Sequence, residues 1–166
     1  MDTFLRVKRL SLKLLHCLLV TTVAVLVLDV LLGVASRYLW GEQVKWTEEL
    51  ATLLLIWVSF LGIAAAFERR AHLGIEMLTD KLSCHARQKL IVIAHCLTLL
   101  FILVVFIGGG IILTRQAVIN WNLLPALQIS DMVMYLPLPV SGIFILIYEL
   151  GNLLDDLHQR EENENG

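Results

Sequence analysis

Residues 14–28 read LLHCLLVTTVAVLVL, a run without a single Asp, Glu, Lys or Arg. The apolar character is interrupted by Asp29 and ends only at Arg37. An α-helix rises about 1.5 Å per residue, so about 20 apolar residues cross the roughly 30 Å of hydrocarbon in a bilayer. A basic segment precedes the run, but the apolar stretch, continued past Asp29 to residue 36, exceeds the roughly 7–15 apolar residues of a cleaved signal peptide. We therefore expect a retained membrane-spanning helix.

The composition agrees with a membrane protein. Of the 166 residues, 58% are hydrophobic and 17% are charged, whereas soluble domains have roughly 45–50% apolar and about 25% charged residues. An ordinary soluble domain is thereby excluded. The net charge of −2 argues against a nucleic-acid partner, which would require a basic surface. Three cysteines without a CxxC spacing predict neither a disulfide framework nor a metal site.

Three more apolar runs are long enough to cross a bilayer, which gives predicted spans at about 14–36, 50–67, 90–113 and 132–153. The sequence thus predicts an all-α integral membrane protein whose single domain, residues 1–166, contains four transmembrane helices. Thr47 is the expected N-cap of the second span. The glycines 108–110 predict a closely packed helix neighbour in the third span. Pro137 and Pro139 predict that the fourth helix kinks or begins near Pro137.

The basic residues predict the orientation. Ten of the thirteen Lys and Arg residues lie before the first span, between the second and third spans, or after the fourth. By the positive-inside rule, both termini and the 68–89 loop face the cytoplasm, and loops 37–49 and 114–131 face outward. Within the 68–89 loop, apolar residues at helical spacing predict a short amphipathic helix at the inner interface. The acidic tail, residues 154–166, is expected to be disordered.

Asp29 is interpreted as the only carboxylate well inside a span. Burial of an ionisable group in hydrocarbon is costly, so such a residue marks a functional hypothesis. A helix–helix hydrogen bond or a contact with another subunit is the main interpretation, and ion coupling is the alternative. His16 and His95 lie at similar depth in two spans, and two histidines on facing helices are what a membrane haem b requires. A haem b anchor of a quinone-linked oxidoreductase is therefore a second hypothesis.

No catalytic motif is present: GxSxG, a P-loop, HExxH and GxGxxG are all missing from the sequence. We therefore expect neither an enzyme nor a cofactor. A small self-assembling channel would need a polar helix face, which Asp29 alone does not make. The densest polar and aromatic group comprises Glu48 and Glu49 with Trp46, and Arg37 with Tyr38 across the same short loop. It is interpreted either as helix capping with an aromatic belt, or as a docking surface for a membrane or soluble partner.

These residues resemble the small membrane subunit of tripartite ATP-independent periplasmic (TRAP) transporters, the DctQ-like family. The matching residues are Arg37-Tyr38, Trp46-Thr47-Glu48-Glu49-Leu50, Trp57, Phe60-Leu61-Gly62, Ala64-Ala65-Ala66 and His72-Leu73-Gly74-Ile75. Their order and spacing extend over about 40 residues. Ser130-Asp131 departs from the family, whose members often place Pro-Trp there, and this leaves the register of the fourth span open.

The resemblance implies a four-span subunit of the bacterial inner membrane without catalysis of its own. Such a subunit braces a large multi-span subunit, which moves an organic acid inward with the sodium gradient, and contributes to docking of a periplasmic substrate-binding protein. Membrane lipids are further expected neighbours. The residues expected to contact partners are Arg37, Tyr38, Trp46, Glu48, Glu49, Trp57, Gly62 and His72, with Asp29 as the intramembrane polar residue. Gly62 with Ala66 forms a small-xxx-small pair that suits packing within the bundle or on a partner.

Overall fold

The computed structural model describes residues 2–42, 44–68 and 84–164. This part of the chain is almost entirely helical, and its one strand-like feature is an isolated bridge between Leu123 and Ser130. The helices are α1 (Asp2–Trp40), α2 (Lys45–Glu68), α4 (Cys84–Phe101), the π-helical η1 (Ile102–Gly109), α5 (Gly110–Asn120), α6 (Met132–Tyr135) and α7 (Pro137–Glu164). The expected all-α class is therefore confirmed.

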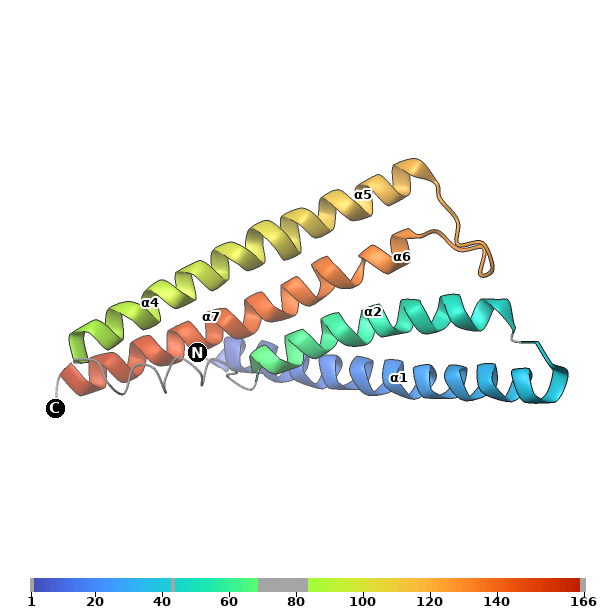
Figure 1. The fold of residues 1–166 in the computed structure, drawn as a ribbon. Helices are drawn as coiled ribbons and strands as arrows, with labels where there is room; N and C mark the ends of the chain where they lie inside the picture. Colours follow the sequence, from blue (N-terminus) through green and yellow to red (C-terminus); the bar gives the residue numbers. More distant parts are fainter. Residues whose placement is uncertain (1, 43, 69–83, 165–166) are drawn as a thin grey trace.

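The four predicted spans are confirmed as helices of sufficient length and apolarity to cross a membrane. They comprise Lys8–Leu39, Lys45–Glu68, Leu90–Asn120 and Met132–Leu153. The third is longer than predicted, because α4, η1 and α5 follow one another without a break and form one long rod (Figure 1). Two further predictions, the amphipathic helix in the 68–89 loop and the contact residue His72, lie largely or wholly outside the described residues.

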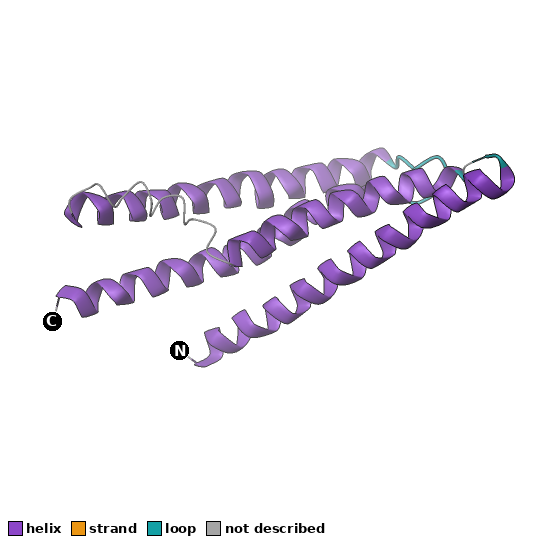
Figure 2. Ribbon diagram, turned by 60° about the horizontal axis from the view of Figure 1, so that its bottom comes forward, coloured by secondary structure: helices purple, strands orange, loops and turns teal. Residues whose placement is uncertain are grey.

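The helices run lengthwise in one bundle. Asp2 and Glu164 lie at one end of it. The turn at residues 41, 42 and 44 and the loop 121–131 lie at the other, which we name the loop end (Figure 2). α7 lies between α2 and the rod formed by α4, η1 and α5, whereas α1 packs mainly on α2 (Figure 1). Burial agrees with this arrangement, because 39% of the apolar 18-residue segment of the fourth span is buried and only 11% of that of the first. α7 is the central helix.

Apolar side chains from α1, α2, η1 and α7 form the core. Phe106 of η1 is central to it, because its ring makes edge contacts with Phe60 and with Phe101 at centroid distances of 6.1 and 5.9 Å. The buried members are Leu15, Leu61, Ala64, Ile102, Phe106, Phe144, Ile145 and Tyr148. Much of the remaining apolar surface of α1 and of the third span is exposed. Such a surface fits a lipid or protein environment and not water.

Of the glycines 108–110, Gly110 meets the close neighbour that the sequence predicts, and that neighbour is α7. A Cβ atom added to Gly108 or Gly109 would meet only a carbonyl oxygen of its own helix. A Cβ atom added to Gly110 would lie 2.7 Å from Cδ of Pro139, and one added to Gly142 would lie 2.8 Å from Cβ of Phe106. The missing side chains therefore allow η1 and α5 to approach α7 at closer range than larger residues permit. This contact holds the third and fourth spans together.

The start of the fourth span resolves the alternatives left by its prolines. α6 ends at Tyr135, and α7 begins at Pro137. Proline suits the first position of a helix, because no partner is needed there for the N–H that it lacks.

Two expectations are wrong. α2 begins at Lys45, so Thr47 is not its N-cap, and the Thr47 hydroxyl donates to the Val44 carbonyl.

The second wrong expectation concerns the acidic tail. The tail is helical as far as Glu164, because α7 continues to that residue. Extension of an existing helix requires no new nucleation, and Leu, Glu, Gln and Arg are good helix formers. The disorder that the charge of the tail predicts is therefore outweighed by the connection of the tail to a long stable helix.

Candidate functional site

The turn between α1 and α2 fixes the geometry of the loop end. Gly41 has a φ of 78°, a left-handed conformation that favours glycine, and its N–H donates to the Arg37 carbonyl at 3.1 Å. The buried Ser36 hydroxyl donates to the Gly33 carbonyl at 2.8 Å and accepts the Val44 N–H at 3.4 Å. These bonds hold α2 beside the last turns of α1.

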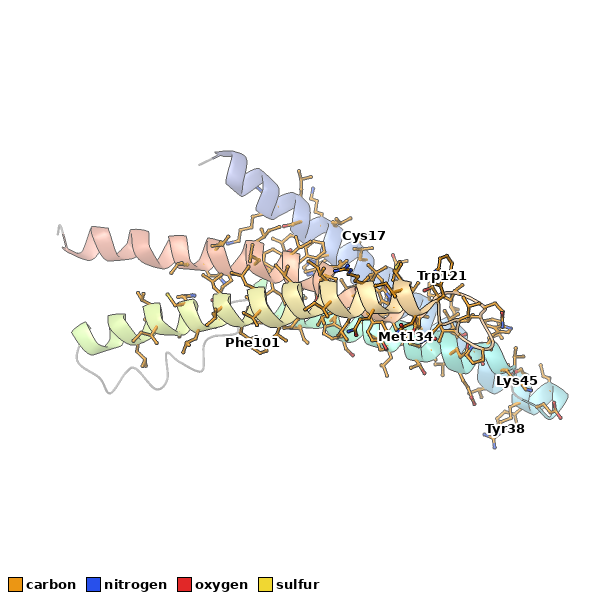
Figure 3. The ribbon with its side chains drawn as sticks, turned by 90° about the horizontal axis from the view of Figure 1, so that it is seen from above. Cys17, Tyr38, Lys45, Phe101, Trp121 and Met134 are labelled. Carbon is orange, nitrogen blue, oxygen red and sulfur yellow. The ribbon has the colours of Figure 1, made fainter. Side chains whose placement is uncertain are left out.

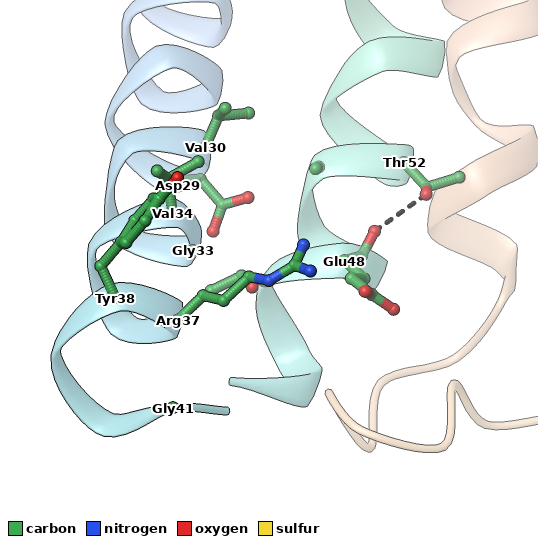
Figure 4. A pocket seen from close by; sticks show the side chains of 11 residues that line it. Asp29, Val30, Gly33, Val34, Arg37, Tyr38, Gly41, Glu48 and Thr52 are labelled. Carbon is green, nitrogen blue, oxygen red and sulfur yellow. Dashed lines mark hydrogen bonds between the residues drawn. The ribbon is translucent and has the colours of Figure 1, made fainter. Parts of the chain in front are cut away.

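A groove of about 940 Å³ lies between the two helices, directly beside this turn. The lining residues are Asp29, Val30, Gly33, Val34, Arg37, Tyr38 and Gly41 from α1 and its turn, with Thr47, Glu48, Ala51 and Thr52 from α2. Figure 4 shows the Asp29 carboxylate and the Arg37 side chain directed into this space, with Glu48 on the facing helix. Three charged side chains therefore share one groove.

Asp29 is the deepest charged residue of the groove. Its exposed fraction is only 5%, and neither of its carboxylate oxygens has a hydrogen-bond partner among the described residues. Asp29 shares the buried stripe of α1 with Gly33 and Ser36, at helical spacing. Arg37 lies eight residues further along, so it is roughly 12 Å closer to the loop end at 1.5 Å per residue.

Glu49 does not join this groove, although it follows Glu48 directly in the sequence. Its carboxylate reaches the loop 121–131 and accepts the Ala126 N–H at 2.9 Å from each oxygen, together with the Leu127 N–H at 2.9 Å. A carboxylate with several backbone N–H donors forms strong, charge-assisted bonds. The predicted polar group is thus divided: Arg37, Tyr38 and Glu48 face the groove, and Glu49 holds the second loop against α2.

Trp57 has an internal role. Its indole Nε1–H donates to the Val133 carbonyl of α6 at 3.1 Å. The residue four positions after Val133 is Pro137, which has no N–H to give to this carbonyl. Trp57 therefore supplies from α2 the donor that the fourth span lacks, as membrane-embedded backbone requires.

Replacement of Trp57 by Phe tests this interaction. We expect the free energy of unfolding to fall by about 1–2 kcal/mol, because a hydrogen bond is lost and a carbonyl is left without its donor. The measurement is the unfolding temperature of the purified chain in detergent. Trp46→Phe is the matched control, since Trp46 is partly exposed. Equal unfolding temperatures for the two variants would contradict the role given to Trp57.

The other predicted contact residues lie on the surface or are half-buried. Tyr38 is 85% exposed and Trp46 is 38% exposed, and Figure 3 shows Tyr38 and Lys45 toward the loop end of the bundle. Gly62 is half-buried, Ala66 is exposed, and a Cβ atom added to Gly62 would meet nothing within 4 Å. Among the residues that the structure describes, none therefore packs closely on the Gly62 and Ala66 pair.

A second intramembrane carboxylate was missed by the sequence analysis. Glu149 of α7 is fully buried, and its Oε1 lies 2.8 Å from Nδ1 of His95 in α4. Nearby, the Asn152 amide donates to the Phe67 carbonyl at 3.4 Å. Asp29 is thus not the only carboxylate inside a span. The signal was the spacing of Ile145, Glu149 and Asn152, which places polar residues on the buried face of the fourth span.

The two histidines considered as haem ligands lie in different surroundings. His95 is buried beside Glu149, whereas His16 is exposed and its Nδ1 lies 3.0 Å from the carbonyl of Leu12 in its own helix. Within the described parts of the chain, no group of three or more His, Cys, Asp or Glu side chains is placed to hold a metal ion. The charged groove and the Glu49 contact remain as the candidate functional features.

Comparison with known proteins identifies the family in which these features occur. Residues 26–159 match the family model described as tripartite ATP-independent periplasmic transporters, DctQ component. The chain is 30% identical over 122 residues to the sialic acid TRAP transporter small permease protein SiaQ of Vibrio cholerae, a match that covers 74% of this chain and 69% of that protein. These comparisons give no support to a haem anchor.

A second relative is a longer protein. The chain is 29% identical over 97 residues to the isethionate TRAP transporter permease protein DctMQ of Oleidesulfovibrio alaskensis, and the match covers 58% of this chain and 15% of that protein. The family match includes the groove, the Glu49 contact and the whole fourth span. The chain belongs to the DctQ family, the small membrane permease subunits of TRAP transporters, and is a multi-pass transport protein and not an enzyme.

Proposed function

We propose that this chain is the small permease subunit of a sodium-driven TRAP transporter for an organic acid. In this proposal it braces the large membrane subunit and forms part of the surface on which a periplasmic substrate-binding protein docks. The two relatives are named for sialic acid and isethionate, both organic acids, which supports that substrate class. The family works with a large membrane subunit.

The fixed loop end is the observation that carries the docking role. Glu49 holds the loop 121–131 to α2, and Ser36 and Gly41 fix the turn between α1 and α2. A surface whose loops are ordered before a partner arrives loses little entropy when it binds. Exposed aromatic and charged residues, including Tyr38 and Glu48, lie on this surface.

The orientation belongs to the same proposal. The excess of Lys and Arg at the termini and between the second and third spans supports cytoplasmic termini in the bacterial inner membrane. The loop end then faces the periplasm, where a soluble binding protein can reach it. The bracing role is supported by α1 and the rod formed by α4, η1 and α5, which carry extensive exposed apolar surface.

Affinity purification of the tagged chain from its native membrane in mild detergent tests the proposal. We expect one many-span membrane protein to co-purify in a fixed ratio, and the sample to show no Soret absorbance. In proteoliposomes, uptake by that partner should require this chain, the binding protein and an inward sodium gradient. Absence of a many-span partner, a haem spectrum, or uptake that is unchanged without this chain would overturn the proposal.

A further inference from the structure

The unpaired carboxylate of Asp29 is the feature that the fold leaves unexplained. Both of its oxygens lack a hydrogen-bond partner among the described residues, and the side chain is 95% buried. Intramembrane ionisable groups in proteins almost always pair with another group, because an unpaired charge in hydrocarbon is costly. The isolated chain therefore bears an unfavourable interaction that a partner can relieve.

The groove gives such a partner access to Asp29. Its volume of about 940 Å³ exceeds that of any single side chain, and it is lined by residues of both α1 and α2. Gly33, one turn from Asp29, contributes no side chain to the lining. Figure 4 shows the Asp29 carboxylate facing the open space between the two helices. The space can therefore receive the side chains of one face of a helix.

The depth of Asp29 decides between a lipid and a protein as the occupant. Arg37 lies roughly 12 Å nearer the loop end, at the rise of 1.5 Å per residue. A lipid whose phosphate contacts Arg37 would place only its acyl chain beside Asp29, and an acyl chain donates no hydrogen bond. Of these two occupants, only a protein side chain brings a donor to the depth of Asp29, and a cation matches the charge of the carboxylate.

We propose that the groove between α1 and α2 receives a transmembrane helix of the large subunit, and that this helix brings a Lys or Arg side chain into contact with Asp29. This inference rests on the proposed function, since it requires a large membrane partner. A second copy of this chain is a poorer occupant. Its exposed Arg115 lies five residues from the end of the third span, whereas Asp29 lies ten residues from the end of the first.

Two measurements on the same variants test the pairing. For Asp29→Asn, we expect the ratio of co-purified large subunit to tagged chain to fall at least about tenfold, because one partner of a buried charge pair is removed. The unfolding temperature of the chain purified alone should be unchanged or higher, because an unpaired carboxylate has been removed. Asp29→Glu should retain the complex. Leu28→Asn, at the neighbouring position that is 66% exposed and outside the groove, is the control and should retain it as well.

A photo-reactive amino acid at Val34 or Thr52, both in the groove, identifies the occupant. We expect cross-links to a transmembrane segment of the large subunit that contains Lys or Arg. An exchange of the two charges, with Asp29→Lys in this chain and Asp at the identified cation, should restore the complex that either single change weakens. Uptake by the Asp29→Glu complex should keep its sodium dependence, because Asp29 pairs with a protein cation.

Each contrary outcome has a distinct meaning. Cross-links to a phospholipid or to a second copy of this chain would overturn the inference, as would an Asn variant that keeps the wild-type ratio. A lower unfolding temperature for the isolated Asn variant would show that Asp29 acts inside the bundle. If the wild-type chain captures no many-span protein at all, the proposed function fails before this inference is reached.

Discussion

Replacement of Gly110 by alanine is expected to force α5 away from α7 and to lower the stability of the bundle. The added Cβ would lie 2.7 Å from Cδ and 2.9 Å from the backbone nitrogen of Pro139. Both atoms belong to a rigid ring at the start of a helix, so neither can move without moving α7. Overpacking of this kind costs about 1–3 kcal/mol, and Gly110→Val, with two more methyl groups, should cost more.

Gly109→Ala is the matched control for this prediction. Its added Cβ would meet only the Val104 carbonyl oxygen, at the ordinary contact distance of 3.8 Å. Alanine also favours a helix over glycine by up to about 1 kcal/mol, so this variant should be as stable as the wild type or more stable. Thermal unfolding in detergent measures both variants. If Gly110→Ala unfolds at the same temperature as Gly109→Ala, the close approach of α5 to α7 is wrong.

The second large effect is expected for Glu49→Ala. The change removes the carboxylate that accepts the Ala126 and Leu127 N–H groups. Hydrogen bonds to a charged group contribute about 1.5–3 kcal/mol each, and because these bonds share one side chain we expect a total loss of about 2–4 kcal/mol. The loop 121–131 should detach from α2, and uptake should fall because the docking surface is no longer ordered.

Hydrogen exchange gives the most direct measurement of this loop. The amides of Ala126 and Leu127 should lose protection in Glu49→Ala and keep part of it in Glu49→Gln, which retains one acceptor oxygen. Glu48→Ala removes the same charge one residue earlier, from an exposed side chain that lines the groove. It should leave the two amides protected. Loss of protection in the Glu48 variant alone would reverse the roles given to the two carboxylates.

Hydropathy and family motifs determined much of this protein in advance. The four spans and a close helix contact within the glycines 108–110 follow from local sequence, whereas the prolines left open whether the fourth helix kinks or begins near Pro137. The free energy of transfer of a residue into lipid depends mainly on its own side chain and its near neighbours. A hydropathy average over a sliding window therefore detects a span. Partner contacts of Trp57 and Glu49 stay a prediction, whereas the structure gives both residues contacts within this chain.

The tertiary structure decided which polar groups meet. Glu49 bonds to a loop 77 residues away, Trp57 to a carbonyl 76 residues away, and His95 to Glu149 across 54 residues. Such pairs depend on how each helix is rotated about its axis. That rotation is set by the close packing of η1 and α5 on α7, and of α1 on α2. The sequence by itself determined where the chain crosses the membrane, because that depends on local transfer free energy. Only the packed bundle decided that Glu48 lines the groove while Glu49 holds a loop, because adjacent residues on a helix point about 100° apart.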